Sequence, residues 1–135
     1  MPLRISRKHH NELLDRALAA GNQECCGLLL GRDDRLFELV PCANVAENLE
    51  HNFELDPVEL LSRHKAARDG GMPIIGYYHS HPNGLARPSA TDTAQAVADG
   101  RYWLIIAGDG VTAWKPLAEA AQVIGFESIP ILVEG

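Results

Sequence analysis

The chain has 135 residues, of which 46% are hydrophobic, and a formal net charge of −6. A chain of this length buries roughly two thirds of its unfolded surface, so we expect one domain over residues 1–135 that folds without a metal. The negative charge argues against nucleic-acid binding, which depends on Lys and Arg side chains that neutralise phosphates. No stretch approaches the roughly 20 apolar residues of a membrane span, so we expect no membrane insertion.

Cysteine content and the first residues of the chain bear on its location. The beginning of the sequence lacks the apolar core and cleavage site of a secretory signal. The three cysteines are an odd number, and they lack zinc-ribbon spacing. We therefore expect a reducing, cytoplasmic location, with Cys25 and Cys26 packed as small apolar residues. A redox role for this vicinal pair is the less favoured alternative.

The first forty residues predict a helix followed by a hairpin. Ser6 can cap a helix over residues 7–20, which carries an apolar stripe and is followed by Gly21. Apolar runs at residues 26–30 and 36–40 are separated by a polar turn, and this pattern is typical of a β-hairpin.

A long segment without periodicity precedes the next helix. Residues 41–55 contain three asparagines and three carboxylates, and we expect a loop or irregular strand that lines something. Asp56 then fits the cap of a helix with Pro57 at its first position, and this helix should run to about Arg68.

Two histidines close the next predicted strand. Residues 72–78 form a short apolar run typical of a buried strand, and His79 and His81 follow it. Side chains at positions i and i+2 of a strand point to the same face, with Cα atoms roughly 6.6 Å apart. Two imidazoles at this spacing can converge on one metal ion.

A helix start faces that strand end across a short loop. Ser89 fits the N-cap of a helix over residues 90–99, and Asp92 falls at its N3 position. Two histidine nitrogens and the Asp92 carboxylate would leave a tetrahedral Zn²⁺ with one open position for water. We therefore expect a catalytic rather than a structural metal site.

The remaining residues predict strands. Runs at residues 102–107 and 111–114 flank a Gly-Asp-Gly turn, which favours a hairpin, and a last strand is expected between residues 122 and 133. Helical and strand patterns alternate without repeats along the chain. The predicted fold class is therefore α/β, with a mixed β-sheet and flanking helices.

Glu24 is the best candidate for a base beside such a metal. A metal held by two neutral imidazoles and one carboxylate lowers the pKa of bound water towards roughly 7, and a nearby base would complete its deprotonation. Glu24 directly precedes the predicted strand over residues 26–30, so it can stand at a sheet end in line with the histidines. Spacing alone also allows a solvated residue in a polar turn.

Each part of this pattern has a simpler interpretation. Ser89-x-x-Asp92 alone is most often a helix cap, and His79-x-His81 alone is most often a pair of strand residues. Their combination with Glu24 favours a site, and the cap and ligand roles can coexist.

These motifs together resemble the JAMM/MPN+ (Mov34/MPN/PAD-1) zinc metalloprotease family in its compact bacterial branch. Glu24 is followed by Cys-Cys-Gly-Leu-Leu-Leu-Gly, and His79-Ser-His81 is followed after seven residues by Ser89-x-x-Asp92. The resemblance implies the MPN (cytidine-deaminase-like) fold. It also implies zinc ligation by His79, His81 and Asp92, a general acid/base at Glu24, and an oxyanion donor at Ser89.

The resemblance also implies an activity. Compact bacterial members of the family look like proteins that trim ubiquitin-like sulfur carriers at their diglycine tail. We therefore expect a zinc-dependent metallopeptidase or isopeptidase that hydrolyses an amide bond at such a Gly-rich tail. The alternatives are a non-catalytic MPN-type interaction scaffold and a zinc hydrolase of a small amide conjugate. The sequence identifies neither the carrier nor an oligomeric state.

Overall fold

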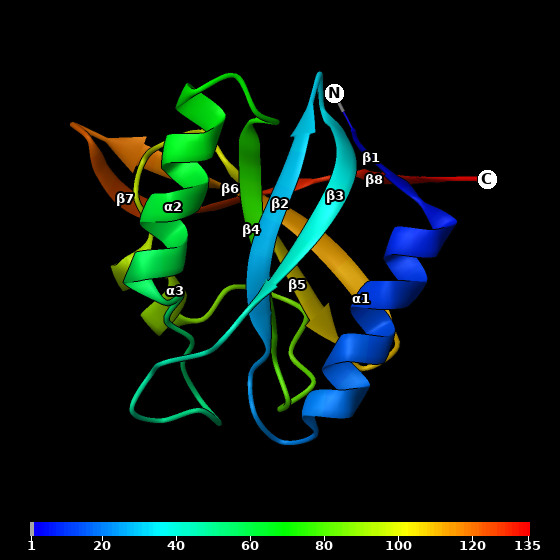
Figure 1. Cartoon of the computed structure of the whole chain (residues 1–135). Helices are drawn as coiled ribbons and strands as arrows, with labels where there is room; N and C mark the ends of the chain where they lie inside the picture. The colour runs from blue at the N-terminus through cyan, green and yellow to red at the C-terminus, as the bar shows by residue number, and fades with distance from the viewer. Residues whose placement is uncertain (1) are drawn as a thin grey trace.

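A computed structural model describes residues 2–135 as one mixed sheet flanked by helices (Figure 1). Its sheet has eight strands in the order β7-β6-β5-β4-β2-β3-β1-β8. In chain order the elements are β1 (Leu3–Ser6), α1 (Arg7–Ala20), β2 (Cys26–Arg32), β3 (Arg35–Cys42), α2 (Pro57–Arg68), β4 (Ile74–Ser80), α3 (Ala90–Gln95), β5 (Tyr102–Ala107), β6 (Gly110–Glu119), β7 (Gln122–Ile129) and β8 (Ile131–Glu134). The α/β class with a mixed sheet and flanking helices is confirmed.

Strand β4 lies at the centre of the sheet, antiparallel to β2 and parallel to β5. Because β2 and β4 run in opposite directions, the start of β2 lies beside the end of β4, where Cys26 pairs with His79. Gly27 allows this close pairing, since a Cβ atom there would collide with the Tyr78 ring. The packing of β2 against β4 therefore requires glycine at position 27.

The two faces of the sheet carry different helices (Figure 1). On one face, Leu13 of α1 packs with Leu29, Tyr78 and Leu104 in the largest buried cluster. On the other face, Leu60 of α2 packs against a smaller cluster of strand residues. Side chains alternate along strands, so neighbouring residues of β2, β4 and β5 contribute to opposite faces.

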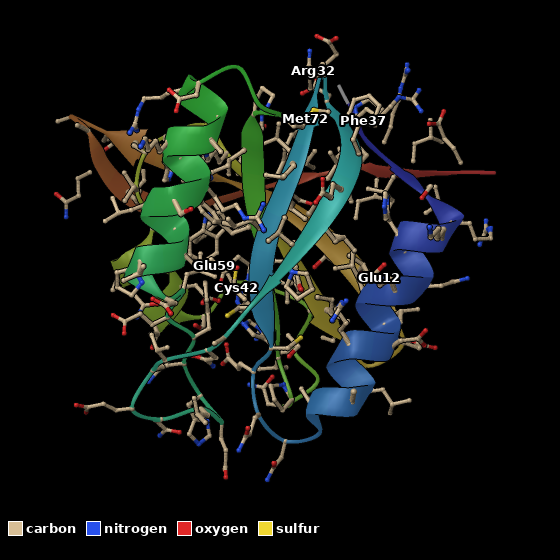
Figure 2. The ribbon with its side chains drawn as sticks, in the orientation of Figure 1. Glu12, Arg32, Phe37, Cys42, Glu59 and Met72 are labelled. Carbon is tan, nitrogen blue, oxygen red and sulfur yellow. The ribbon has the colours of Figure 1, made fainter. Side chains whose placement is uncertain are left out.

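Helix α2 is attached more loosely than α1. Its cap is formed as expected, because the Asp56 side chain accepts the backbone N–H of Val58 at 3.0 Å, but α2 buries none of its own residues. Figure 2 labels Glu59 of α2 and Cys42 at the end of β3. Burial and the neighbouring Glu59 raise the pKa of Cys42 to about 11, so this thiol is protonated at neutral pH.

The ends of the chain depart from the expected strands. Strand β1 was not predicted, and the single expected strand over residues 122–133 is divided into β7 and β8. Pro130 lies at the division, where the missing N–H cannot continue a ladder. β7 pairs with β6, whereas β8 pairs in parallel with β1 at the opposite edge. Strands β1 and β8 have only four residues each and pair with each other across the chain, so the sequence around each one shows almost no strand pattern.

Helix α3 is shorter than expected, and β6 is longer. The helix predicted over residues 90–99 ends at Gln95, because Ala96 is extended and packs against the cluster that contains Trp103. Strand β6 continues past Trp114 to Glu119, where its pairing with β7 compensates for a weak local pattern. In both cases tertiary contacts outweigh local preference.

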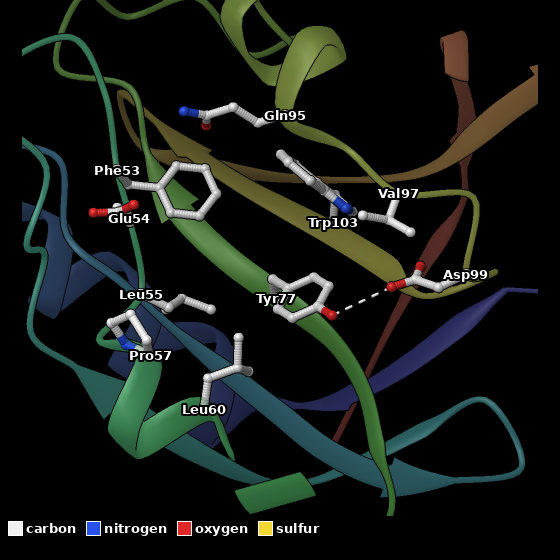
Figure 3. Close-up of a pocket in the computed structure, with 10 residues that line it drawn as sticks. All are labelled: Phe53, Glu54, Leu55, Pro57, Leu60, Tyr77, Gln95, Val97, Asp99 and Trp103. Carbon is white, nitrogen blue, oxygen red and sulfur yellow. Dashed lines mark hydrogen bonds between the residues drawn. The ribbon is translucent and has the colours of Figure 1, made fainter. Parts of the chain in front are cut away.

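A groove of about 420 Å³ opens between α2 and the β4–β5 face (Figure 3). The hydroxyl of Tyr77 donates to Asp99 at 3.2 Å across one wall. Its lining is mainly apolar and consists of Phe53, Glu54, Leu55, Pro57, Leu60, Tyr77, Gln95, Val97, Asp99 and Trp103. The long segment between β3 and α2 therefore lines a groove, as its length predicted. Among residues 2–135, none of the helices has the length and apolar character to cross a membrane.

Candidate metal centre

The end of β4 and the start of α3 bring three ligand-type atoms together. The Nε2 atoms of His79 and His81 lie 3.0 Å apart, and Oδ2 of Asp92 lies 3.3 Å and 3.1 Å from them. Ligands of a tetrahedral zinc with bonds of 2.0–2.1 Å stand about 3.3 Å apart. The three atoms are therefore spaced as three corners of a tetrahedral coordination shell.

Both imidazole rings are held in place. Nδ1 of His81 lies 2.8 Å from the Leu85 carbonyl, which can only accept, so in the neutral ring Nδ1 carries the proton and Nε2 presents its lone pair. His79 is fully buried, and Phe53 stacks on its ring at a centroid distance of 4.2 Å. Trp103 contacts the same ring edge-on at 5.6 Å. These contacts aim both Nε2 atoms at Asp92.

Burial and hydrogen bonding set the charges of these groups. Burial lowers the pKa of His79, whereas hydrogen bonds with Asp92 and Leu85 outweigh burial and raise the pKa of His81. Burial alone would raise the pKa of Asp92, but the hydrogen bonds with the two histidines hold it well below its usual range. Asp92 is therefore a carboxylate at neutral pH.

Asp92 also completes the cap of α3. The Ser89 hydroxyl accepts the Asp92 backbone N–H at 3.0 Å, and Asp92 Oδ2 accepts the Ser89 backbone N–H at 2.8 Å. The cap and the convergence with the histidines therefore coexist, as the sequence allowed. Because the Ser89 oxygen accepts in this bond, its own proton is left to donate elsewhere.

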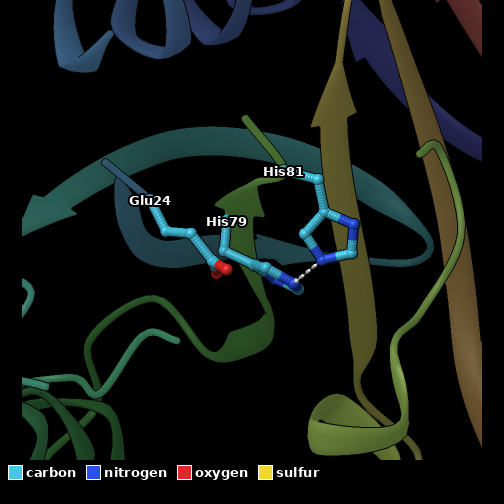
Figure 4. Close-up of side chains that lie close together, drawn as sticks. All are labelled: Glu24, His79 and His81. Atoms are coloured by element: carbon cyan, nitrogen blue, oxygen red, sulfur yellow. Dashed lines mark hydrogen bonds between the residues drawn. The ribbon is translucent and has the colours of Figure 1, made fainter. Parts of the chain in front are cut away.

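Strand register places Glu24 beside the histidines. Beyond the Cys26–His79 pair, Ser80 donates its N–H to the Cys25 carbonyl at 3.0 Å, and its hydroxyl accepts the Cys25 N–H at 2.9 Å. Continued by one residue, this register sets Glu24 opposite His81. Ligand atoms of Glu24, His79 and His81 all lie within 4.8 Å of one another (Figure 4).

The Glu24 carboxyl is buried without compensation. Its side chain belongs to a residue only 6% exposed, and Oε1 has no hydrogen-bond partner among the residues that the structure describes. Burial raises the pKa of Glu24 to about 7, although the charge of His81 partly opposes this shift. An unpaired buried carboxyl oxygen is costly, and a bound group beside it would relieve that cost.

A small cavity of about 40 Å³ lies over this centre. Glu24, His81 and Ser89 line it, together with Glu50, His51, Pro82 and Asn83. A single water needs about 10–15 Å³ of such space. The cavity can therefore hold a water and a small carbonyl group, but no large side chain.

The structure brings all five predicted site residues together, and it adds contacts that sequence reasoning missed. Phe53 covers His79, and Asn44 donates to the Glu24 carbonyl at 2.9 Å. Phe53 is the single aromatic residue within the polar segment over residues 41–55, and this isolation was a signal that it packs inward. Asn44 stands among several similar asparagines, so its sequence context gave no comparable signal.

Comparison with known proteins finds one matching family model and several similar sequences. The family model for prokaryotic homologs of the JAB domain matches residues 6–117. A desampylase from Haloferax volcanii is 40% identical over 96 residues, which is 68% of this chain and 69% of the relative. A probable TtuB-protein conjugate cleaving protease from Thermus thermophilus is 35% identical over 101 residues, which is 75% of this chain and 66% of the relative.

Solved structures agree with this relationship. The solution structure of a protein from Desulfitobacterium hafniense has a TM-score of 0.77 at 29% identity, and the match covers 97% of this chain and 92% of that one. A JAB1/MPN domain protein from Archaeoglobus fulgidus shares the fold, with a TM-score of 0.57 at 21% identity over 96% of each chain. The expected MPN fold is thereby confirmed, and the chain belongs to the family of prokaryotic homologs of the JAB domain, the JAMM type.

Proposed function

We propose that this chain is a zinc-dependent metallopeptidase that hydrolyses an amide bond at the Gly-rich C-terminal tail of a ubiquitin-like, sulfur-carrier protein. The observation that carries this proposal is the spacing of 3.0–3.3 Å among His79 Nε2, His81 Nε2 and Asp92 Oδ2, with the unpaired Glu24 carboxyl beside them. Four buried polar groups that converge on one point are costly to bury, and a bound metal would offset this cost, which favours an enzyme over an interaction scaffold.

The donor set fits zinc. Two neutral imidazoles and one carboxylate at tetrahedral spacing suit Zn²⁺ and leave its fourth position open. His79, His81 and Asp92 would hold the ion. When bound there, zinc supplies a Lewis acid that polarises a carbonyl oxygen and lowers the pKa of a water towards roughly 7.

Glu24 acts as the general acid/base. One of its carboxyl oxygens lies within 4.8 Å of the ligand nitrogens of both histidines, which is close enough to reach a water beside the metal position. Its carboxylate accepts a proton from the attacking water and then donates this proton to the leaving amine. A pKa of about 7 suits both steps, because both protonation states are accessible near neutral pH.

Ser89 stabilises the oxyanion that forms on the attacked carbonyl. Its hydroxyl faces the small cavity shared with Glu24 and His81, and its proton is not used in the cap of α3. A hydroxyl held by a helix cap is preorganised, so no reorganisation is needed when the negative charge develops.

The size of the cavity supports a glycine-rich substrate. The cavity of about 40 Å³ at the centre has room for a carbonyl group and little room for a side chain, which suits glycine. Two relatives are named a desampylase and a probable TtuB-protein conjugate cleaving protease, and we extend cleavage of such conjugates to this chain. The leaving group is the amine that is joined to the tail.

The 420 Å³ groove receives residues that precede the glycines. Phe53 and Trp103 line the groove and also contact His79, so the groove adjoins the centre directly. An extended segment advances about 3.3 Å per residue. A tail with its glycines at the centre therefore places an apolar side chain of an earlier residue in the groove.

We also infer a cytoplasmic location. Cys25, Cys26 and Cys42 are all free thiols, and burial raises the pKa of Cys26 to about 12. Unreactive, reduced cysteines suit a reducing compartment.

One experiment separates this enzyme from the two alternatives. Metal content is measured for the wild type and Glu24→Gln, and each protein is incubated with a ubiquitin-like carrier fused through Gly-Gly to a reporter protein. We expect about one zinc per chain in both proteins and cleavage after Gly-Gly by the wild type alone. Zinc without cleavage of this fusion, but with hydrolysis of a small aminoacyl amide, favours the small-amide hydrolase. Absence of zinc and of any hydrolysis favours the scaffold.

A further inference from the structure

The segment over residues 43–56, between β3 and α2, is organised by one side chain. We propose that Asn44 is a positioning residue that fixes Glu24 relative to the groove wall, so that the base and the substrate share one support. This inference rests on the proposed function for the role of Glu24, but its geometric part can be measured without activity.

All of the hydrogen-bonding capacity of the Asn44 amide is used. Its Nδ2 donates to the carbonyl of Glu24 at 2.9 Å and to that of Asn52 at 3.0 Å. Its Oδ1 accepts the backbone N–H groups of Ala46 and Glu54, each at 3.0 Å. One half-buried side chain therefore joins both arms of the segment and ties them to Glu24.

Glu24 depends on these bonds because it lies outside the sheet. Strand β2 begins at Cys26, so Glu24 has no ladder partner of its own. Its backbone N–H donates to the Leu49 carbonyl at 2.6 Å, and its carbonyl accepts from Asn44. Both main-chain groups of the base are therefore held by the segment over residues 43–56.

The same segment builds the substrate side of the centre. Phe53 stacks on His79, and Phe53, Glu54 and Leu55 line the groove. The backbone N–H of Glu54 binds the Asn44 side chain. Asn44 therefore bonds both Glu54 in the groove wall and the proposed base Glu24. A tail bound in the groove would contact the same segment that sets the position of Glu24.

Only an amide side chain satisfies this arrangement. Two carbonyls require donors, and two N–H groups require an acceptor, which Asn supplies from one planar group. Aspartate retains the acceptor for Ala46 and Glu54 but cannot donate to Glu24 and Asn52. Alanine loses all four bonds.

The test compares Asn44→Ala and Asn44→Asp with Asn48→Ala. Asn48 is an exposed asparagine in the same segment, and its side chain only accepts the nearby N–H of Glu50. We measure kcat and KM on the Gly-Gly carrier fusion, zinc per chain, and hydrogen exchange of the Glu24 amide in the metal-free protein. Because a misplacement of about 1 Å can cost on the order of 100-fold in rate, kcat should fall about 10- to 100-fold in both Asn44 variants.

The other readouts distinguish positioning from general damage. Zinc content should stay at about one per chain in both variants, because the proposed ligands are not altered, while the Glu24 amide exchanges at least about tenfold faster. KM should change less than about threefold in Asn44→Asp, which keeps the acceptor for the Glu54 N–H of the groove wall. Asn48→Ala should match the wild type within about twofold. Unchanged Glu24 exchange in both Asn44 variants overturns the inference, as does an equal loss of kcat in Asn48→Ala. If the wild type cleaves nothing, the proposed function fails, while the exchange result still decides whether Asn44 keeps the Glu24 N–H bonded to the Leu49 carbonyl.

Discussion

The two sides of the metal centre are built in different ways. The histidines and Asp92 come from one stretch of chain, residues 79–92, in which the end of β4, a short loop and the cap of α3 supply most of the contacts. Glu24 comes from elsewhere and is held by Asn44, Leu49 and the Cys25–Ser80 pairing. The ligand side is local, and the base side depends on tertiary contacts.

This difference indicates that the ligand side controls metal binding and the Glu24 side controls turnover. The proposed ligands come from one stretch of chain, so metal binding should tolerate changes elsewhere, apart from changes at Phe53 and Trp103, which hold the His79 ring. Glu24 depends on bonds to residues 20 or more positions away, so catalysis should be sensitive to the segment over residues 43–56. Mutations can therefore separate metal content from turnover, and the first two predictions below use that separation.

The largest effect is expected for Asp92→Asn. Asparagine keeps an oxygen that can accept the Ser89 N–H in the α3 cap, but it removes the negative charge from the proposed ligand set. We expect zinc occupancy to fall well below one per chain and hydrolysis to disappear. Metal analysis after dialysis and thermal unfolding with and without zinc provide the measurement, because free zinc at 100 times its Kd should stabilise the wild type by about 2.7 kcal/mol.

The comparison protein for this test is Glu24→Gln, which should keep both its zinc and its thermal stabilisation by zinc. Equal zinc content in Asp92→Asn and the wild type would remove Asp92 from the ligand set.

Ser89→Ala should reduce turnover next most strongly. Loss of one oxyanion donor typically costs about 100- to 1,000-fold in kcat, and loss of the α3 cap costs about 1 kcal/mol of stability. Zinc should remain bound. Ser6→Ala is a matched control, because Ser6 caps α1 in the same way through the His9 N–H at 3.1 Å and lies in a different element from the centre. It should lose similar stability and no activity. Full activity in Ser89→Ala would exclude the oxyanion role.

Sequence reasoning performed best where the centre is local. The spacing of His79 and His81, and the cap formed by Ser89 and Asp92, are short-range patterns, and the structure brings all four residues together. The place of Glu24 before a predicted strand made it a candidate, but only the family resemblance favoured it over a solvated residue, because Asn22 and Gln23 before it are equally typical of a solvated turn.

The failures lie where distant residues decide. Strand β1 exists because β8, at the other end of the chain, pairs with it, and helix α3 stops early because Ala96 packs against the Trp103 cluster. The bonds of Asn44 belong to the same class, since its sequence neighbours say nothing of Glu24. Local patterns therefore predicted that the proposed ligands lie together, whereas the support of Glu24 required the folded structure.

The buried Glu24 carboxyl should make the metal-free protein less stable at higher pH. Its pKa is raised from 4.5 to about 7, so between these values the unfolded chain loses a proton that the folded chain retains. Stability therefore falls as pH rises through this window, by up to about 3 kcal/mol at 1.36 kcal/mol per unit. Urea unfolding at pH 5 and pH 8 should show that Glu24→Gln gains stability relative to the wild type at the higher pH.

Glu47→Gln is the control for charge alone, because Glu47 is an exposed carboxyl in the same segment. It should follow the wild type at both values of pH. A constant difference between Glu24→Gln and the wild type from pH 5 to pH 8 would show that burial does not shift the Glu24 carboxyl.

The smallest effect is expected from crowding the groove with Val97→Trp. Val97 lines the groove but is 67% exposed, so the larger side chain can be accommodated without disturbing the core. A substrate side chain that loses about 60 Å² of apolar contact loses about 1.5 kcal/mol, or roughly tenfold in affinity. We expect KM for the carrier fusion to rise about tenfold while kcat and zinc content stay unchanged. Ile124→Trp, at an exposed apolar position on β7, should leave KM unaltered. A fall in kcat instead of a rise in KM would argue against tail binding in the groove, because loss of substrate binding alone raises KM and leaves kcat unchanged.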